Sequence, residues 1–512
     1  MDSKKGYIIG VDVGTTIIRA ALFDGNGDLV VCHDDTVEPV VKSGERGEVL
    51  VEIIPDDLFN KFICVVKNSL EHVPLSAEVS LAIATQRNSI VVWEKANNHC
   101  RQFNSSFTFK VINACGFVLH AITRKARFLA ARRLRMLPSM LSHRMIDMID
   151  NSEELQSLLQ KEDLAFGGLE SWLIMRMSHK NEHVFETSSI SSSGTFDPWI
   201  GDFNHFLLGI IGFPTKLLAP IRDTNFSDSP AKPKLDAKFC GREIPIHAMI
   251  ADQQAATFGS GVWKPGDVKV SLGTGTFVDV VTEEAHASVT GFYPLVGWRL
   301  NGKSTFLAEG NAYDTSTILN WAQSVGFFDN VKETSSIAQS VANSNGTFFI
   351  PAFCGLQVPI NDENACCGFI GFKPDTTRSH MIRALLESIV FRVFQIFNVA
   401  QNELTIDNDT AIRICGGVSQ NDFICQAIAD ILERDVARSD EPRLTAAKGA
   451  AFIAGISLGY WKLEDLSPKL PIEKIFEPQG REVHENIKKT YSAWEKAVKR
   501  CERFYEQHLS NQ

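Results

Sequence analysis

An acidic residue and a glycine–threonine turn stand near the start of the chain, at the end of an apolar run. The run Tyr7–Val13 carries Asp12 and leads into Gly14, Thr15 and Thr16. Glycine lets the main chain approach an anion closely, and the threonines add hydroxyl donors beside main-chain N–H groups. A carboxylate here suits Mg²⁺, which prefers one or two carboxylates together with water and phosphate oxygens. Taken alone, the segment would fit a plain β-hairpin turn equally well.

A second turn of the same composition lies in the other half of the chain. A strand-like run, V-K-V-S-L, leads into Gly273, Thr274, Gly275 and Thr276. Each turn opens what we expect to be its own half of the molecule. Two such turns facing each other across a cleft could hold one polyphosphate from both sides, and a coincidental pair is much less expected than either turn alone.

Asp252 is the candidate catalytic residue. It follows an apolar strand expected over Ile244–Ala251 and opens a helix together with Gln253. In open α/β sheets, functional groups gather at the carboxyl ends of the strands. There Asp252 would accept the proton of a substrate hydroxyl that attacks a γ-phosphorus, a reaction that needs one base, one metal ion and a donor-rich phosphate cradle. The alternative is that Asp252 only caps the helix.

A double glycine near the end of the chain is a further candidate for ligand contact. Gly416 and Gly417 follow a strand that ends at Cys415, and they precede a helix expected over Asp422–Leu432. The absence of side chains here would let a flat ligand lie against the backbone. Asn421 suits either a helix cap or a contact with a nucleobase. A tight strand–helix turn is the alternative reading of the whole segment.

The composition is that of an ordinary globular enzyme, and the length indicates two domains. The chain has 512 residues, of which 44% are hydrophobic and 22% charged, and this length favours two domains of about 250 residues each. The net charge of −10 argues against a nucleic-acid partner. No apolar run reaches the length of about 18 residues that a membrane span needs.

The expected location is the cytoplasm. The first strand begins at Tyr7, which leaves no room for a signal peptide, and the 11 cysteines form no C-x-x-C pair. Scattered cysteines in a long chain indicate reduced thiols in a reducing compartment. Association with a mitochondrial surface stays open, as does a homo-oligomer.

Alternating strands and helices predict an α/β fold. We expect strands over Ile8–Val13, Arg19–Phe23, Gly47–Val51 and Ser80–Ala84, and a helix over Asp56–Leu70. Further along, the pattern predicts a strand over Ala411–Cys415 and one amphipathic helix over Val483–Leu509. The expected domains are residues 1–247, which would carry the first phosphate loop, residues 248–475, and a helical extension over 476–512.

Three segments are less self-explanatory. Thr187–Thr195 is rich in serine and threonine, and Glu387 lies in an otherwise apolar helix, where we expect it to be a structural ion-pair partner. Phe103–Ile146 holds several lysines and arginines but no acidic residue. A solvated basic helix face is the favoured reading of this basic segment, and an anion-facing or membrane-surface helix is the alternative.

Taken in order, seven motifs resemble the FGGY carbohydrate kinases, in particular the glycerol kinases and a divergent animal branch of them. They are D-V-G-T-T-I-I-R, T-Q-R, A-D-Q-Q-A-A-T-F-G, L-G-T-G-T-F, P-A-F-C-G-L, L-L-E-S-I-V-F-R and C-G-G-V-S-Q-N, spread over about residues 6–500. The resemblance implies two ribonuclease-H-like α/β domains, of the actin/hexokinase/Hsp70 type, flanking a deep catalytic cleft. It also implies Mg²⁺- and ATP-dependent phosphorylation of a polyol, with glycerol favoured.

The resemblance assigns a role to each matching residue. On the polyol side it implies Asp12 at the metal, Thr15, Thr16 and Arg19 in the first phosphate loop, Arg87 and Gln253 as polyol ligands, and Asp252 as base and polyol ligand. On the nucleotide side it implies Gly273, Thr274 and Gly275 in the second phosphate loop, Ser316 and Asn320 as nucleotide contacts, and Gly417 and Asn421 as adenosine contacts.

The chain departs from the family pattern on the acceptor side. Asn88 stands where glycerol kinases usually have a glutamate that binds glycerol, and no tryptophan-containing substrate segment lies between Trp93 and Phe117. The family tyrosine that contacts glycerol is not recognisable either. On the nucleotide side, Cys415 replaces the aspartate of a D-G-G motif.

These departures leave alternatives beside phosphorylation of glycerol to glycerol 3-phosphate for glycerol and triglyceride metabolism. The acceptor could be another small polyol or sugar. The chain could also be a catalytically weak nucleotide-binding regulator, or the product of an alternative or mis-assembled transcript.

Overall fold

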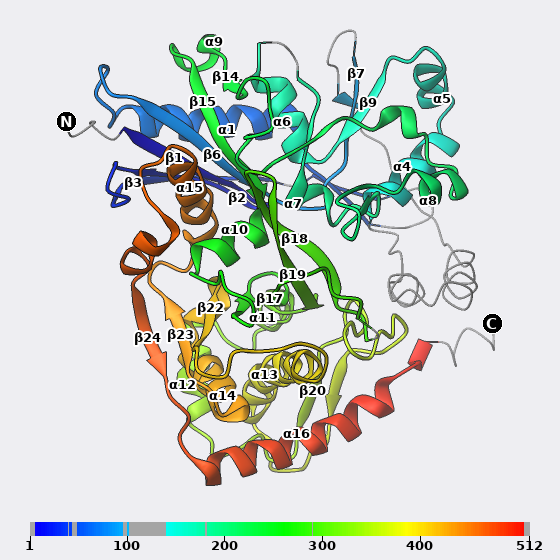
Figure 1. Ribbon diagram of the computed structural model, residues 1–512. Helices are drawn as coiled ribbons and strands as arrows, with labels where there is room; N and C mark the ends of the chain where they lie inside the picture. Colours follow the sequence, from blue (N-terminus) through cyan, green and yellow to red (C-terminus); the bar gives the residue numbers. More distant parts are fainter. Residues whose placement is uncertain are drawn as a thin grey trace. The chain divides into compact units, whose positions relative to one another are not determined.

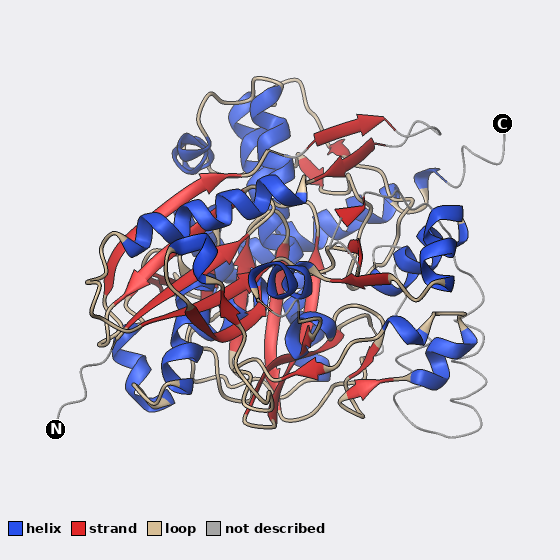
Figure 2. Ribbon diagram, turned by 90° about the horizontal axis from the view of Figure 1, so that it is seen from above, coloured by secondary structure: helices blue, strands red, loops and turns tan. Residues whose placement is uncertain are grey.

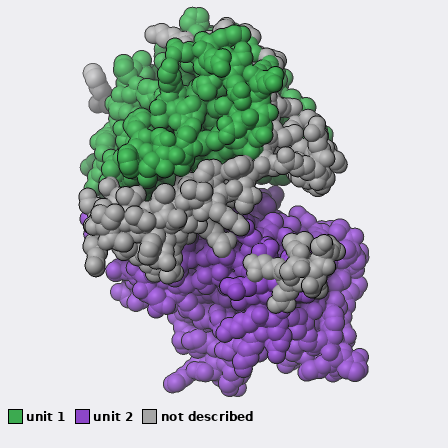
Figure 3. Space-filling view, turned by 90° about the vertical axis from the view of Figure 1, so that its right-hand side faces the viewer, with its two compact units in different colours: residues 1–261, 294–306, 444–469 green, residues 262–293, 307–443, 470–512 purple. Residues whose placement is uncertain are grey.

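The computed structural model describes residues 6–38, 40–43, 49–95, 100–101, 140–179, 182–288 and 290–505. The chain forms two compact units, coloured separately in Figure 3. Unit 1 consists of Met1–Gly261, Pro294–Phe306 and Leu444–Lys469, and unit 2 consists of Val262–Tyr293, Leu307–Arg443 and Leu470–Gln512. Both units combine strands with helices (Figure 2). The domain boundaries expected from sequence stay a prediction, as do the roles of the domains.

The central sheet of unit 1 has six strands in the order β14-β15-β6-β1-β2-β3 (Figure 1). Their bounds are Lys234–Leu235 for β14, Ile244–Ala251 for β15, Val79–Thr85 for β6, Tyr7–Val13 for β1, Ile17–Phe23 for β2 and Leu29–Thr36 for β3. Strands β1, β6 and β15 run parallel, and Thr85 of β6 pairs with both Val13 and Ala251. The carboxyl ends of these three strands therefore meet at one edge of the sheet.

Helices cover both faces of this sheet. Neighbouring side chains of a strand point to opposite faces, so each strand contributes residues to both of these interfaces. Ile9 and Val11 of β1 belong to an apolar core shared with α1 (Pro55–Leu70). Gly10, between them, faces α15 (Thr445–Ser457) so closely that a Cβ would lie 2.2 Å from a carbonyl oxygen of that helix. The sheet is thus buried on both faces, which explains why its central strands are almost wholly apolar.

Helix α15 also packs backbone to backbone against α10 (Asp252–Gly259). A Cβ on Gly449 would lie 1.9 Å from the carbonyl oxygen of Ala255, and one on Gly259 would lie 2.1 Å from that of Thr445. Only glycine permits this approach. The close contact with α15 fixes the position of α10, whose first residue is Asp252.

The rest of unit 1 forms smaller sheets and short helices beside the central sheet. They are β4 (Val40–Ser43), β5 (Val49–Glu52), β7 (Val91–Glu94), β8 (Cys100–Arg101), α4 (Leu141–Asp150), α5 (Glu153–Gln160), β9 (Leu164–Gly167), α6 (Leu169–Met177), β10 (Phe185–Glu186), α7 (Thr187–Ile190), β11 (Phe196–Asp197), β12 (Asp202–Phe203), α8 (His205–Ile210), a 3-10 turn (Thr215–Leu217), β13 (Ile221–Arg222) and α9 (Ala237–Cys240).

A seven-stranded sheet, in the order β18-β19-β17-β16-β22-β23-β24, provides the framework of unit 2. Its bounds are Tyr293–Leu300 for β18, Lys303–Ala312 for β19, Thr276–Thr282 for β17, Val268–Leu272 for β16, Ile412–Cys415 for β22, Val436–Ser439 for β23 and Ile472–Phe476 for β24. Strands β16, β22 and β23 are parallel. The ends of β16 and β22 therefore meet at one edge. The β18–β19 hairpin carries residues of both units.

Helices and a two-stranded sheet complete unit 2. They are α11 (Ser316–Ser324), α12 (Thr334–Gln339), β20 (Phe348–Ile350), β21 (Gly368–Ile370), α13 (Arg378–Glu403), α14 (Asp422–Leu432) and α16 (Arg481–Cys501), with 3-10 turns at Val331–Glu333 and Gly417–Gln420. Another 3-10 turn, Leu463–Lys469, belongs to unit 1. Glu387 of α13 is ion-paired with Arg383 at 2.7 Å, so the expected structural role is confirmed.

Most expected elements are present, with three instructive differences. The strand that follows the first hairpin is β3. The sequence did not predict it, because the strand is half exposed and carries polar residues at its centre. The expected segment Gly47–Val51 overlaps β5, which pairs with β4 instead of joining the central sheet. The C-terminal helix ends at Cys501 rather than at the expected Leu509. Glu502 has an extended backbone, and the main-chain N–H of Arg503 donates to the carboxylate of Asp362 at 2.7 Å.

Two expectations fall largely outside the described residues. Of the basic segment Phe103–Ile146, the structure describes only the part from Met140 onward, and the segment between Trp93 and Phe117 is described only up to Lys95 and at Cys100–Arg101. Within the described ranges, no helix combines the length and the apolar composition that a membrane crossing requires.

The close approach of α10 and α15 yields a stability prediction. We expect Gly449→Ala to lower the apparent free energy of unfolding by about 2–3 kcal/mol, because the added methyl overlaps a carbonyl oxygen. Gly209→Ala on α8 is the matched control, since a Cβ there meets nothing within 4 Å. It should be neutral or stabilising by up to about 1 kcal/mol. Urea unfolding followed by fluorescence measures both, and equal effects of the two changes would contradict the prediction.

Candidate active site

Three candidate residues meet at the carboxyl edge of the unit 1 sheet. Asp12 lies in β1, opposite Ala84 of β6, and Arg87 follows the end of β6. Asp252 follows the end of β15. Because β1, β6 and β15 are parallel and adjacent, these side chains belong to one small region, as Figure 1 shows for the strands that carry them. The edge can therefore present a metal ligand, a polyol ligand and a base together.

The first predicted phosphate loop is a tight turn between β1 and β2. The N–H of Gly14 donates to the carbonyl of Ile17 at 3.1 Å, and the backbone at Gly14 approaches that carbonyl closely enough that a Cβ would lie 3.0 Å from it. Thr15 and Thr16 are exposed at the tip. Their hydroxyl groups are accessible to a ligand, as the prediction requires.

Arg19 is held by a residue that sequence reasoning missed. It lies opposite Asp12 on one side and opposite Asp34 of β3 on the other. Its guanidinium group donates to both carboxylate oxygens of Asp34, at 2.8 and 3.0 Å, and Arg19 is only 7% exposed. This bidentate pair fixes the guanidinium. A direct contact of Arg19 with phosphate stays a prediction.

The carboxyl group of Asp12 has an unusual electrostatic environment. Burial, followed by the neighbouring carboxylate of Asp252, raises the pKa of Asp12 to about 7, and the charge of Arg19 opposes this only in part. A partly desolvated carboxylate beside a second one would be stabilised by a cation. The environment therefore fits Mg²⁺, which binds through one or two protein carboxylates and substrate phosphates rather than through a full protein cage. Among the described residues, no cluster of three or more metal-ligating side chains forms such a cage.

Asp252 begins α10, and Ala251 takes the N-cap position without a side-chain hydrogen bond. The alternative reading of Asp252 as the N-cap is therefore wrong. Its Oδ1 accepts the N–H of Gln253 at 2.7 Å, and both residues are partly exposed. The amino end of a helix also favours the ionised form of a carboxylate, which a general base requires.

The acceptor side has a polar arrangement around Asn88, which replaces the family glutamate. Asn88 has a positive φ of 58°. Its side-chain oxygen accepts the hydroxyl of Ser192 at 3.3 Å, and its carbonyl accepts Arg144 of α4 at 3.1 Å. Ser192 lies in the serine-rich stretch Thr187–Thr195 and Arg144 in the basic segment Phe103–Ile146, but the sequence did not predict their contacts with Asn88, because both contacts are long-range.

In unit 2, the second predicted phosphate loop is held by the start of α11. The N–H of Thr315 donates to the carbonyl of Thr274 at 3.0 Å, and that of Ser316 donates to Gly273 at 3.2 Å. A Cβ on Gly275 would lie 2.8 Å from a carbonyl of β19, so the loop requires glycine there. The structure thus brings Ser316 to the loop, and Asn320 lies one helical turn further on, on the same face of α11.

The double glycine lies against this loop. A Cβ on Gly416 would lie 2.4 Å from the carbonyl of Leu272, whereas one on the exposed Gly417 would meet nothing within 4 Å. Gly417 therefore leaves open space for a ligand. Asn421 caps α14 by accepting the N–H of Ile424 at 3.2 Å and also donates to Thr334 at 2.9 Å. The cap role is confirmed, and the adenosine contacts stay predictions.

Two family models match almost the entire chain. The N-terminal domain of the FGGY family of carbohydrate kinases matches residues 7–259, and its C-terminal domain matches residues 268–458. The chain belongs to the FGGY family of carbohydrate kinases. It is accordingly a phosphotransferase that acts on an alcohol group, and its acceptor class is a sugar or polyol.

Individual relatives show which kinases of this family the chain is similar to. The chain is 35% identical to "Glycerol kinase 5" of Danio rerio over 528 residues, covering 98% of each, and 33% identical to "Glycerol kinase 5" of Homo sapiens, covering 98% of this chain and 96% of the relative. It is 28% identical to "Glycerol kinase" of a Thermoanaerobacter species, over 98% of this chain and 99% of the relative. The resemblance drawn from the motifs is confirmed.

Solved structures confirm the two-domain α/β fold. Plasmodium falciparum glycerol kinase with ADP superposes with a TM-score of 0.81 at 21% identity, over 97% of this chain and 98% of that one. Xylulose kinase of Lactobacillus acidophilus gives 0.77 at 19% identity, over 96% and 97%. At these identities the structures support the fold alone.

Two further carboxyl groups of unit 1 are deeply buried. Glu170 of α6 is 3% exposed, and Glu186 at the end of β10 is 0% exposed. Burial raises the pKa of Glu170 to about 7, and the charge of Glu186 adds to this. A folded-state pKa above the unfolded value means that the folded chain binds more protons, so the contribution of Glu170 to stability is lost as the pH rises through about 7.

We therefore expect Glu170→Gln to stabilise the protein relative to wild type at pH 8 but to have little effect at pH 5. The amide mimics the protonated acid, and the difference should approach about 3 kcal/mol above pH 7. Melting temperatures of both proteins at the two pH values measure it. Glu71→Gln, at an exposed position, is the control and should show no such pH dependence. A constant offset between Glu170→Gln and wild type at both pH values would contradict the assignment.

Proposed function

We propose that this protein transfers the γ-phosphoryl group of ATP to a hydroxyl group of glycerol, giving glycerol 3-phosphate, with Mg²⁺ as the metal. The observation that carries the proposal is the placing of Asp252 beside Asp12 at one sheet edge, next to the exposed turn of Thr15 and Thr16. Relatives named glycerol kinase and "Glycerol kinase 5" support glycerol as the acceptor.

In this proposal each residue has a simple task. Asp252 accepts the proton of the attacking substrate hydroxyl. At the same time the hydroxyl oxygen forms a bond to the γ-phosphorus, and the bond between that phosphorus and the β–γ bridging oxygen breaks. Thr15 and Thr16 donate hydrogen bonds to phosphate oxygens, and the Gly273–Gly275 loop does the same. Mg²⁺, held by Asp12, would neutralise phosphate charge.

The residues around Asn88 favour a second candidate class of acceptor. Arg87 and Gln253 would hydrogen-bond the hydroxyl groups that are not phosphorylated. Asn88 cannot supply the negative acceptor of a glutamate, and it is held by Ser192 and Arg144. This altered wall favours a different small polyol or sugar as the alternative acceptor.

Replacing the proposed base tests the assignment directly. We expect Asp252→Asn to lower glycerol-dependent ADP release by about 100-fold or more, because the attacking hydroxyl loses its proton acceptor. ATP binding should persist. Asp375→Asn, at an exposed position of unit 2, is the control. Turnover of Asp252→Asn close to wild type would refute the base. Turnover of the wild type with another polyol but not with glycerol would refute only the acceptor.

The metal assignment has its own test. We expect Asp12→Asn to raise the Mg²⁺ concentration needed for half-maximal ADP release by about tenfold or more, because a neutral amide binds the cation weakly. A titration of Mg²⁺ at fixed ATP measures it. An unchanged Mg²⁺ requirement would show that Asp12 does not hold the metal.

A further inference from the structure

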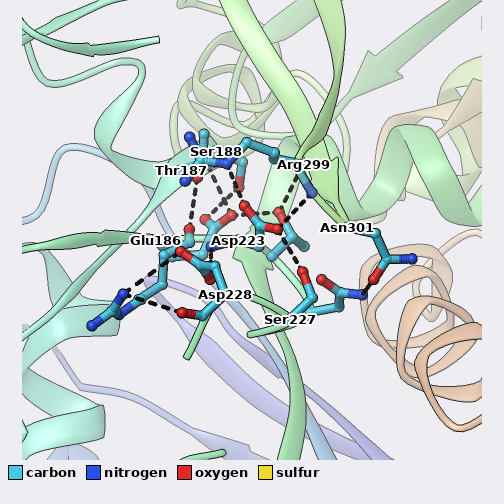
Figure 4. A network of polar contacts seen from close by, with 12 residues as sticks. Glu186, Thr187, Ser188, Asp223, Ser227, Asp228, Arg299 and Asn301 are labelled. Carbon is cyan, nitrogen blue, oxygen red and sulfur yellow. Dashed lines mark hydrogen bonds and ion pairs between the residues drawn. The ribbon is translucent and has the colours of Figure 1, made fainter. Parts of the chain in front are cut away.

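A buried glutamate lies at the start of α7, near the carboxyl end of β15 (Figure 4). The Oε1 of Glu186 accepts the N–H of Ser188 at 2.9 Å and the hydroxyl of Thr224 at 2.6 Å. Its Oε2 accepts the hydroxyl of Ser188 at 2.6 Å and the N–H of Ser189 at 2.9 Å. A carboxylate has about four lone-pair positions, and all of them are used here. Glu186 therefore has no capacity left for a substrate.

Ser188 passes this interaction on to β15. Its hydroxyl donates its single hydrogen to Glu186, so its lone pairs are directed elsewhere, and one accepts the N–H of Ala251 at 2.9 Å. The carbonyl of Ser188 accepts the side chain of Gln254 at 3.3 Å. Ala251 is the residue directly before Asp252, so a hydrogen-bond chain of two steps links Glu186 to the residue next to the proposed base.

Thr224 forms a second arm from the same carboxylate to the same strand. Its hydroxyl donates to Glu186, and its carbonyl accepts the N–H of Met249 at 3.0 Å. The hydroxyl oxygen also accepts the N–H of Arg299 at 3.1 Å. The side chain of Arg299 is in turn paired with Asp223, which is 2% exposed. Figure 4 shows Glu186, Ser188, Asp223 and Arg299 in one network of polar contacts.

The two arms meet a structural need of β15. On one side the strand pairs with β6 from Ile246 to Ala251, with an irregularity between Ile246 and Ala248, but on the other β14 pairs only with Ile244 and Pro245. The N–H groups of Met249 and Ala251, two residues apart, point to the same side of the strand, where no strand accepts them. Thr224 and Ser188 accept these two N–H groups, and Glu186 holds both acceptors.

We propose that Glu186 and Ser188 are positioning residues for Asp252: they fix the end of β15 and hence the direction of the carboxylate that takes the substrate proton. The inference rests on the proposed function only in making Asp252 the base. Neither residue touches the substrate, so removing the link should lower kcat while leaving the KM for ATP nearly unchanged.

A double-mutant cycle tests the link. With glycerol and Mg·ATP, Ser188→Ala should lower kcat by about 10- to 100-fold in the wild-type background, because the base is misplaced. In the Asp252→Asn background the same change should cost nothing further. Glu186→Gln should behave alike, since its amide nitrogen cannot accept two of the four hydrogen bonds. Ser193→Ala is the matched control, as Ser193 is 2% exposed in the same segment but bonds Ile190 and Thr195 rather than β15.

Several results would overturn the inference. They are wild-type kcat in Ser188→Ala, an equal loss in both backgrounds, or an equal loss in Ser193→Ala. Should Asp252→Asn itself retain turnover, the proposed function fails, but a second measurement still decides the link. Hydrogen exchange in the absence of substrate should be about tenfold faster at the Ala251 amide in Ser188→Ala than in Ser193→Ala. Unchanged exchange there would show that Ser188 does not hold β15.

Discussion

The parallel register of β1, β6 and β15 is the constraint on which the candidate site of unit 1 depends. Because Thr85 is paired with the last residues of both neighbouring strands, three chain segments distant in sequence must end together. That register is secured by burial on both faces, with α1 on one and the small-residue helix α15 on the other. A slip of one residue would exchange the apolar and the glycine-lined faces, so packing and the site are specified by the same contacts.

Unit 1 keeps several carboxylates away from water and stabilises them in different ways. Glu186 is satisfied by four hydrogen bonds, and Glu170 has a pKa raised to about 7, so that it can remain protonated. The pKa of Asp12 is also raised to about 7, but Asp12 is only half-buried and lies beside the carboxylate of Asp252. Of the three, Asp12 is the one whose environment suits a cation, which agrees with a metal role rather than a purely structural one.

The sequence predicted well what is encoded locally. Glycine–threonine segments after apolar runs predicted the two turns that the structure forms at Gly14 and at Gly273–Gly275, and the strand-to-helix junction at Asp252 was also predicted, because turn chemistry and strand ends are visible within about ten residues. Asp34 was missed because its strand is half exposed and carries a polar H-D-D run that resembles a loop. Glu186 was missed for another reason: its partner Thr224 lies 38 residues away, and its neighbour Ser188 contacts Ala251, which is 63 residues from Ser188. The serine-rich stretch was noticed, but nothing local revealed which backbone it serves.

Helix α15 has a consequence for how the chain is made. It covers the glycine-bearing face of the unit 1 sheet, yet it lies at Thr445–Ser457, after most of unit 2. A ribosome therefore synthesises all six strands of that sheet long before the helix that buries one face of it. Until then the face around Gly10 has no native cover, so unit 1 cannot reach its final packing during synthesis of its own first 261 residues. Completion of unit 1 is thus a late event in biosynthesis, and the nascent chain must keep an apolar sheet face from other partners while unit 2 is being made.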